Sequence, residues 1–385
     1  MLRKKILVII GTRPEATKMG SVINELKRKS DLFETVVIVT GQHREQLYQA
    51  LNDFNIKPNY DLKIMKTQQT VSYITAEAIS LLNPLVDELK PDLILVHGDT
   101  QTTLSASLTA YFNKVPIGHI EAGLRTYNKY SPWPEEGNRK ITDSIADIMF
   151  APTLNSKKNL LKEGCNPNNI FITGQTAVDA ALNTFKPQYK FKEERLNEIV
   201  NHKRLPIITI TAHRRENYGE SMTNIFKAIN RISKQFSEHM IIYPVHLSPY
   251  IRDLASSILS DQNNIFLIEP LVYMDMINLI ARSKLIMSDS GGIQEEAAVF
   301  NIPLVLMRDT TERPEAVDAG KIVVSGTDEE RIYKITKQLL VDKSIYNKMV
   351  NAPNPFGDGY ASQRIIQILE HYFKLNAKLP EEFVL

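Results

Sequence analysis

The sequence predicts an α/β protein made of two doubly wound domains, each a parallel sheet with helices on both faces. Its 385 residues exceed the size at which one hydrophobic core usually stops growing. Short apolar runs alternate with amphipathic stretches in both halves. A polar, charged stretch near residues 185–205 separates these halves. We expect a first domain over 1–185 and a second over 186–360.

The expected strands are continuous apolar runs, which are typical of strands covered on both faces. In the first half they are Lys5–Ile10, Thr35–Thr40, Leu93–His97, Ile117–Glu121, Ile148–Ala151 and Ile170–Thr173. In the second half they are Ile207–Thr211, Met240–Val245, Ile265–Ile268, Leu285–Ser288, Leu304–Met307 and Ile322–Val324. Ligands of such sheets bind beyond the carboxyl ends of the strands, so two facing domains would form one deep cleft.

Amphipathic stretches between these runs predict helices, for example Glu15–Lys29, Val71–Leu89, Met222–Lys234 and Glu329–Val341. A proline- and glycine-rich turn cluster at 353–359 precedes a last helical pattern from Ala361 to about Leu375. We expect this C-terminal segment, within 361–385, to dock back on the first domain.

Composition excludes several classes of protein. The net charge is 46 − 44 = +2 with no long basic run, so a nucleic-acid partner is not expected. The single cysteine, Cys165, excludes an intrachain disulfide framework and a multi-cysteine metal site. The apolar run Ile6–Ile10 is too short for an export signal, and no run approaches the ~18 apolar residues of a membrane helix. We expect a cytoplasmic protein with no membrane partner.

Two copies of one short motif indicate a phosphorylated ligand. The segments 11–16 and 311–316 share Arg-Pro-Glu-Ala, and each follows an apolar run and leads towards a helix. Arginine offers a fork that matches phosphate, and proline suits the first helical position. A third segment, 288–296, also runs from strand into helix. Helix starts bind anions, so we expect a phosphorylated or nucleotide-linked ligand.

Polar groups that could transfer protons follow the expected strands. They are Asp99, Glu121, Glu135 and His213. Other interpretations stay open: Asp99-Thr100 could cap the next helix, Glu135 and Glu136 could be first-turn helix acids, and His213 could be structural. An unpaired carboxylate is costly at the end of an apolar strand, which favours a functional Glu121.

The motifs of other nucleotide enzymes are absent from the sequence. The run G-x-G-x-x-G does not follow the first strand, where only Gly11 and Gly20 occur. There is no G-x-x-x-x-G-K-[ST] and no H-E-x-x-H. We therefore expect neither a nicotinamide cofactor nor a metal.

The motifs together are similar to those of one known family. They are Gly-Thr-Arg-Pro-Glu-Ala (11–16), Gly-Gln-His-Arg-Glu (41–45), Val-His-Gly-Asp-Thr (96–100), Glu-Ala-Gly-Leu-Arg (121–125), Pro-Trp-Pro-Glu-Glu (132–136), His-Arg-Arg-Glu-Asn (213–217), Tyr-Pro-Val-His-Leu (243–247), Asp-Ser-Gly-Gly-Ile-Gln-Glu-Glu (289–296) and Arg-Asp-Thr-Thr-Glu-Arg-Pro-Glu (308–315). In order, from about residue 4 to 370, the chain resembles the bacterial non-hydrolysing UDP-N-acetylglucosamine 2-epimerases.

The resemblance implies a GT-B-like fold of two Rossmann-like domains with the active site between them. It implies reversible conversion of UDP-GlcNAc to UDP-ManNAc, through elimination of UDP to a 2-acetamidoglucal and its re-addition, without nicotinamide or metal. It also implies a homodimer whose product supplies envelope, capsule or teichoic-acid polymers. Carried over by motif, the catalytic residues are Asp99, Glu121, Glu135 and His213, and the UDP ligands are Arg13, Lys18, Ser290, Gly291, Gly292, Glu296 and Arg313.

Some relatives bind a second UDP-GlcNAc as an activator, and Gln42, His43 and Arg44 match that allosteric segment. Several activated relatives have an arginine at the position of Gln68, so this chain lacks a guanidinium group that could bind phosphate there. Residues 297–301 also depart, with Asn301 where relatives often have glycine. The alternatives are a hydrolysing epimerase that releases ManNAc, a GT-B glycosyltransferase, and a catalytically silent nucleotide-sugar sensor.

Overall fold

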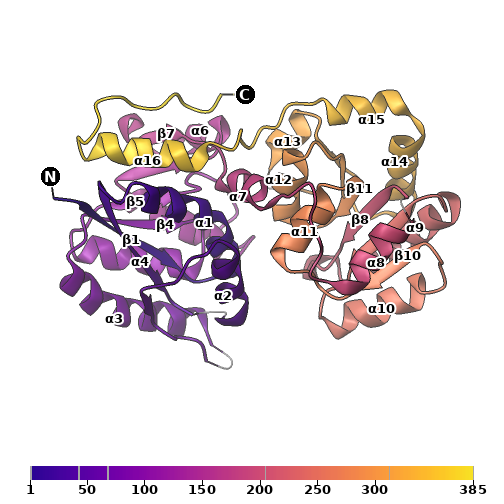
Figure 1. Cartoon of the computed structure of the whole chain (residues 1–385), viewed down its shortest axis with the longest axis horizontal. Coiled ribbons are helices and arrows are strands. Elements are labelled where there is room, and N and C mark those ends of the chain that lie inside the picture. Colours follow the sequence, from indigo (N-terminus) through magenta and orange to yellow (C-terminus); the bar gives the residue numbers. More distant parts are fainter. Residues whose placement is uncertain (1, 42–43, 67–68, 204, 312, 385) are drawn as a thin grey trace. The chain divides into compact units, whose positions relative to one another are not determined.

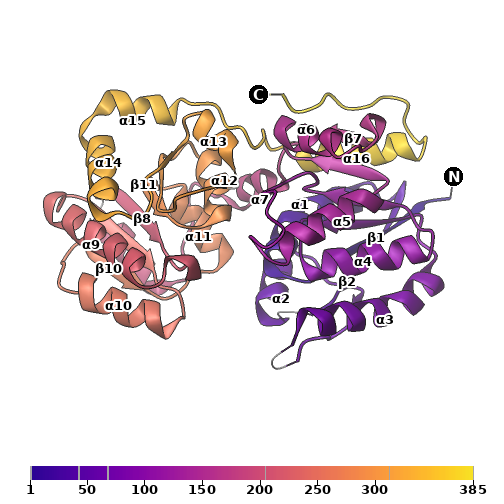
Figure 2. The same ribbon diagram turned by 180° about the vertical axis from the view of Figure 1, so that it is seen from behind.

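The computed structural model describes residues 2–41, 44–66, 69–203, 205–311 and 313–384. The chain divides into two compact units, one formed by Met1–Asn183 with Phe356–Leu385 and the other by Thr184–Pro355. Each unit is a parallel sheet with helices on both faces, which confirms the predicted fold class (Figures 1 and 2). The chain first passes from one unit to the other between Asn183 and Thr184, two residues before the expected boundary at 185/186.

Unit 1 contains β1 (Lys4–Ile10), α1 (Arg13–Arg28), β2 (Phe33–Val39), α2 (Arg44–Asp53), β3 (Tyr60–Asp61), α3 (Val71–Leu89), β4 (Leu93–His97), α4 (Gln101–Phe112), β5 (Ile117–Ile120), α5 (Glu135–Ile145), β6 (Ile148–Ala151), α6 (Leu154–Lys162), η1 (Pro167–Asn169), β7 (Ile170–Ile172), α7 (Thr176–Thr184) and α16 (Ala361–Tyr372). The strand order is β3-β2-β1-β4-β5-β6-β7. Helix α4 packs against α3 and α5 on one face, and α1 packs against α2 and α16 on the other (Figures 1 and 2).

Unit 2 contains α8 (Glu194–Lys203), β8 (Ile207–Thr211), η2 (Arg215–Asn217), α9 (Glu220–Gln235), β9 (Met240–Pro244), α10 (Pro249–Leu259), β10 (Ile265–Ile268), α11 (Tyr273–Ile280), β11 (Ser283–Ser288), α12 (Gly291–Val299), β12 (Leu304–Leu306), α13 (Pro314–Asp318), β13 (Ile322–Val324), α14 (Glu329–Val341) and α15 (Lys343–Val350). Its strand order, β10-β9-β8-β11-β12-β13, repeats the pattern of unit 1. In both sheets the order reverses direction beside the first strand, which defines a switch point at β1/β4 and another at β8/β11.

The C-terminal segment belongs to unit 1. Helix α16 packs on α1, and Asp179 accepts hydrogen bonds from the amides of Ala361 and Ser362 at its start. Further on, the amide of Phe383 donates to Ile172 O at 2.9 Å, so the end of the chain lies along the edge strand β7. The last helix ends at Tyr372, earlier than the expected Leu375, and Lys374 follows with φ 56°.

Most expected strands match the structure to within one or two residues at each end, and two differences have a clear physical reason. Strand β3 was not predicted, because two residues paired at a sheet edge have no hydrophobic periodicity to detect. The strand predicted over Ile117–Glu121 ends at Ile120, because Glu121 takes a left-handed conformation with φ 68° that no strand accommodates.

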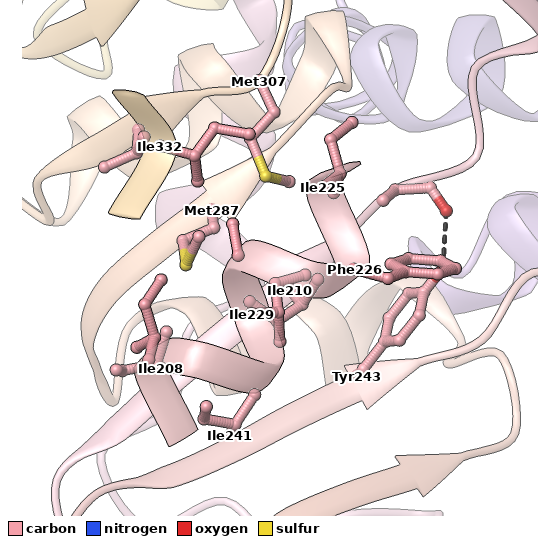
Figure 3. Close-up of a cluster of buried hydrophobic side chains, with 14 of the residues drawn as sticks. Ile208, Ile210, Ile225, Phe226, Ile229, Ile241, Tyr243, Met287, Met307 and Ile332 are labelled. Atoms are coloured by element: carbon pink, nitrogen blue, oxygen red, sulfur yellow. Dashed lines mark hydrogen bonds between the residues drawn. The ribbon is translucent and has the colours of Figure 1, made fainter. Parts of the chain in front are cut away.

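The core of unit 2 positions the backbone that leads to its candidate histidine. Ile208 and Ile210 of β8 pack with Phe226 of α9 in a continuous apolar cluster (Figure 3). Tyr243 of β9 is almost completely buried in this cluster, and its hydroxyl donates to Ala212 O at 2.6 Å. This hydrogen bond fixes the peptide directly before residue 213.

Asn301 occupies a backbone conformation that glycine usually adopts. Its φ is 57°, in the left-handed region that glycine and asparagine tolerate best. Its side chain has a second role, because Oδ1 accepts a hydrogen bond from Lys321 Nζ at 2.6 Å. Lys321 is 1% exposed and also donates to Val350 O at 2.7 Å. Burial lowers the pKa of Lys321, and these two acceptors satisfy its buried amine.

Replacing Tyr243 by phenylalanine should destabilise unit 2, because Ala212 O would lose a buried hydrogen bond while the ring packing stays intact. We expect a loss of about 1–3 kcal/mol in the free energy of unfolding. Urea unfolding measures it, with Tyr333→Phe at an exposed hydroxyl as the control. Equal stability of the two variants would contradict the role given to Tyr243.

Candidate active site

The predicted phosphate and proton-transfer residues of unit 1 gather at its switch point. The loop Gly11–Thr12 after β1 and the loop Gly98–Thr100 after β4 lie at the carboxyl ends of adjacent parallel strands. The loop after β5, which carries Glu121, is next to them. Ligand sites of doubly wound sheets lie at this position.

A buried carboxylate ties the first two loops together. Glu15 is 2% exposed, and its Oε2 accepts hydrogen bonds from the amides of Gly11 and Thr12 at 3.0 and 2.7 Å. Its Oε1 accepts from the hydroxyl of Thr100 at 2.7 Å and lies 3.2 Å from that of Thr103. Burial raises the pKa of Glu15, although these donors oppose the shift. Glu15 is therefore a structural clamp, and the T-x-x-E spacing of a capping box was its signal in the sequence.

Glu121 and Lys18 form an ion pair at this edge. Lys18 Nζ contacts Glu121 Oε2, and their side chains are only 14% and 8% exposed. Glu121 has φ 68°, a strained conformation for a residue with a side chain, and such strain is often found at functional sites. His97 Nε2 lies 3.7 Å from the same carboxylate oxygen. Burial is the main cause that lowers the pKa of His97 to about 4, so its ring is neutral at neutral pH.

Asp99 does not cap helix α4. Thr100 is the N-cap residue, and its side chain accepts from the amide of Thr103. Asp99 Oδ2 instead pairs with Arg139 at 2.6 Å, and Asn138 donates to its backbone carbonyl at 2.9 Å. The carboxylate keeps 24% exposure. Asp99 is thus oriented from α5 and partly accessible, as a proton-transfer group requires.

The neighbouring acids Glu135 and Glu136 differ in their surroundings. Glu136 is completely buried and accepts hydrogen bonds from the amides of Thr126 and Tyr127, so it is structural. Glu135 begins α5, and its Oε2 is buried with no hydrogen-bond partner among the described residues. That orphaned oxygen favours a functional Glu135 over a simple helix-capping acid.

A buried network behind the site orients the Gly98–Asp99 peptide. His119 Nε2 lies 2.8 Å from Gly98 O, and Nδ1 lies 2.6 Å from Asp143 Oδ1. Asp143 also accepts from Gly123 N at 3.1 Å and pairs with Arg125 at 2.7 Å. Burial opposes ionisation of Asp143, but His119 and Arg125 outweigh it and lower its pKa. The partner of His119 could not be predicted from the sequence, because Asp143 lies on a different element.

Unit 2 builds a matching arrangement at β8/β11. Asp289 follows β11 and is completely buried, and its Oδ2 accepts from the amides of His213 and Arg214 at 2.9 and 2.8 Å. His213 Nδ1 lies 3.7 Å from Asp289 Oδ1. The ring of His213 stacks on His246 with centroids 5.2 Å apart. Burial lowers the pKa of His213, against the effect of Asp289, so the ring is predominantly neutral at neutral pH.

The strand-to-helix turn after β11 places the predicted phosphate ligands beside His213. Ser290 is the N-cap residue of α12, and its amide donates to Ser288 Oγ at 2.9 Å. The amides of Gly291 and Gly292 start the helix, where backbone N–H groups have no intrahelical acceptor. A Cβ on Gly292 would meet nothing within 4 Å, so space for a ligand is open there. Glu296 lies on the same helix and is partly exposed.

Arg313, which the sequence predicts as a UDP ligand, is largely buried and forms an ion pair within unit 2. Its Nε donates to Glu295 Oε1 at 2.7 Å, and the two side chains are 10% and 1% exposed. Arg13, its counterpart in the echoed motif, is exposed at the first turn of α1. The two copies of the Arg-Pro-Glu-Ala motif therefore begin helices of different length: α1 has sixteen residues, whereas α13 (Pro314–Asp318) has five.

Of the predicted allosteric residues, Gln42 and His43 lie outside the described residues, as does Gln68, while Arg44 begins α2. Within the part of the chain that the structure describes, no group of three or more His, Cys, Asp or Glu side chains could hold a metal ion. No helix in these ranges combines the length and the apolar composition needed to cross a membrane.

Comparisons with known proteins agree with this arrangement. A family model described as UDP-N-acetylglucosamine 2-epimerase matches residues 24–370. A UDP-N-acetylglucosamine 2-epimerase of Bacillus subtilis is 48% identical over 383 residues, covering 100% of this chain and 99% of the relative. The structure of S. aureus MnaA with UDP matches with a TM-score of 0.90 at 44% identity, covering 99% of this chain and 100% of that chain.

A structure of UDP-GlcNAc 2-epimerase from Neisseria meningitidis bound to UDP-GlcNAc has a TM-score of 0.87 at 44% identity. It covers 95% of this chain, and 99% of that chain is matched. These matches over most or all of the chain confirm both the GT-B-like fold class and the family resemblance inferred from the motifs. The chain belongs to the UDP-N-acetylglucosamine 2-epimerase family.

Proposed function

We propose that this chain interconverts UDP-GlcNAc and UDP-ManNAc by a non-hydrolysing inversion at carbon 2. The observation that carries the proposal is the strained, nearly buried Glu121 carboxylate, held by Lys18 beside Asp99 at a switch point. A carboxylate fixed in this way suits proton transfer rather than ligand binding alone. The relative from Neisseria meningitidis binds UDP-GlcNAc, which supports the choice of substrate.

The chemistry explains why several carboxylates are needed. The proton on carbon 2 becomes acidic only as the bond from carbon 1 to the diphosphate oxygen breaks, because no carbonyl lies beside it. A carboxylate takes this proton, the C–H electron pair forms the C1=C2 double bond, and UDP leaves with the C1–O electrons. Return of a proton to the opposite face requires a second donor. Asp99, Glu121 and Glu135 supply these groups in the proposal.

Unit 2 supplies stabilisation of the leaving diphosphate. The amides at the start of α12 and the Ser290 hydroxyl are donors for phosphate oxygens. His213 is held by Asp289 and His246, and a bound diphosphate would favour its protonated form and so allow proton transfer to the leaving group. The motif resemblance also assigns Arg13, Lys18, Glu296 and Arg313 to UDP binding. Elimination and re-addition leave the oxidation state of the sugar unchanged, so the reaction needs no nicotinamide.

Proton NMR of the purified protein with UDP-GlcNAc in deuterated water, without added cofactor or metal, tests the proposal. We expect UDP-ManNAc with deuterium at carbon 2. Free ManNAc with UDP would assign the protein to the hydrolysing class, in which water intercepts the glucal. Unchanged UDP-GlcNAc in the presence of measurable UDP binding would contradict an epimerase and favour a transferase or a sensor.

Glu121→Gln and Asp99→Asn should each lower kcat by roughly 10²–10⁴-fold, because an amide cannot accept the carbon 2 proton. UDP affinity should stay measurable, since neither side chain is assigned to the nucleotide. Steady-state kinetics on both variants check this, with Glu34→Gln at an exposed ion pair as the control. Rates like those of the wild type in both variants would refute the carboxylate assignment.

Arg313→Ala should weaken UDP binding by roughly 1.5–3 kcal/mol, the range for a charge-assisted hydrogen bond. It should also destabilise the folded state, because Glu295 would lose its buried ion pair. Calorimetry with UDP and urea unfolding separate the two effects. Glu295→Gln is the control: it should reduce stability while it retains more UDP affinity than Arg313→Ala. Unchanged UDP binding in Arg313→Ala would exclude Arg313 as a ligand.

We further propose that the enzyme is a cytoplasmic homodimer whose product supplies ManNAc units for envelope, capsule or teichoic-acid polymers. The support is the motif resemblance together with identity to family members along the whole chain. Light scattering should give about twice the chain mass of 43.8 kDa. A mass of one chain at micromolar concentration would exclude the dimer.

A further inference from the structure

His97 is a buried polar residue that the proposed reaction leaves without a role. It is the last residue of β4 and 3% exposed. Among the described residues its Nε2 has no hydrogen-bond partner, and this atom lies 3.7 Å from Glu121 Oε2. A buried nitrogen without a partner costs free energy, and in native proteins such atoms call for a functional explanation.

Any role of His97 as an acceptor depends on which ring nitrogen carries the hydrogen. A neutral imidazole has an N–H on one nitrogen and a lone pair on the other. Nε2 lies 3.7 Å from Glu121 Oε2, so it can accept from that carboxyl only in the form of the ring that carries the hydrogen on Nδ1. Burial and the nearby Lys18 and His119 keep the ring neutral, while Glu121 acts in the opposite direction.

We propose that His97 is a positioning residue for proton transfer, whose Nε2 accepts a hydrogen bond from Glu121 once that carboxyl has taken the proton from carbon 2. The role rests on the proposed epimerase function. In this step the C2–H bond breaks and the Glu121 O–H bond forms, while the C–H electron pair becomes the C1=C2 double bond and the C1–O pair leaves with UDP. The new O–H then donates to Nε2, and no other group changes its protonation.

The charges around His97 explain why this contact favours the forward step. With Glu121 ionised, Lys18 satisfies the carboxylate, and Nε2 faces a negative oxygen with nothing to accept. With Glu121 protonated, Nε2 gains the hydrogen bond that it lacks. The interaction is therefore made only as the proton arrives, and interactions of this kind raise kcat rather than substrate affinity.

Two variants separate this role from packing. In His97→Asn the amide nitrogen overlies Nδ1, but no atom occupies the position of Nε2. In His97→Gln the side-chain oxygen reaches that position and can accept. We expect His97→Asn to lower kcat by roughly 10–100-fold while KM changes little, and His97→Gln to recover most of the activity. With substrate deuterated at carbon 2, the primary isotope effect on kcat should increase in His97→Asn, because proton abstraction becomes slower.

The possible results distinguish a failure of the role of His97 from a failure of the proposed epimerase function. Equal activity in wild type and His97→Asn, or equal losses in both variants, would overturn the role of His97 alone. A wild-type protein that binds UDP but never exchanges the carbon 2 proton would overturn the epimerase function and, with it, this role. A ¹⁵N-histidine NMR spectrum of the wild type, with His97 assigned by its loss in His97→Gln, is independent of variant kinetics. It should show a bare Nε2 at neutral pH, and a protonated Nε2 would overturn the proposal.

Discussion

One buried carboxylate at each switch point holds the loops on which the proposed chemistry depends. In unit 1, Glu15 joins the loop after β1 to Thr100 in the loop after β4. In unit 2, Asp289 after β11 joins that strand to the backbone of residues 213 and 214 after β8. The parallel sheet brings these loops to one edge, but only such clamps fix their side chains to the precision that catalysis requires.

The two clamps support different kinds of chemistry. Around Glu15 the functional groups are enclosed: Lys18 and Glu121 are mostly buried, and His97 is neutral behind them. Charge–charge interactions are strong in such surroundings, which suits transfer of a poorly acidic proton. Around Asp289 the partly exposed His213 accompanies a helix start with an open position at Gly292, which suits a large anionic leaving group.

Much of the fold and of the candidate site could be predicted from the sequence, because both depend on local patterns. Apolar runs located nearly every strand, and strand ends located Asp99 and Glu121. The helix-cap alternative for Asp99-Thr100 holds for Thr100, which caps α4, but not for Asp99, which pairs with Arg139 of α5. Partners of this kind are brought together by the tertiary fold, so spacing cannot reveal them. For the same reason the contact from Glu15 to Thr100, the clamp role of Asp289 and the orphaned Nε2 of His97 could not be predicted.

In the proposed reaction the C1–O bond of the nucleotide sugar breaks as a carboxylate removes the carbon 2 proton. Positional isotope exchange reports on cleavage of this bond. UDP-GlcNAc carrying ¹⁸O in the oxygen between carbon 1 and the β-phosphorus is incubated with the enzyme, and ³¹P NMR follows the label. We expect ¹⁸O to appear in non-bridging β-phosphate positions at a rate comparable to epimerisation. Formation of UDP-ManNAc with the label still entirely in the bridge would contradict it.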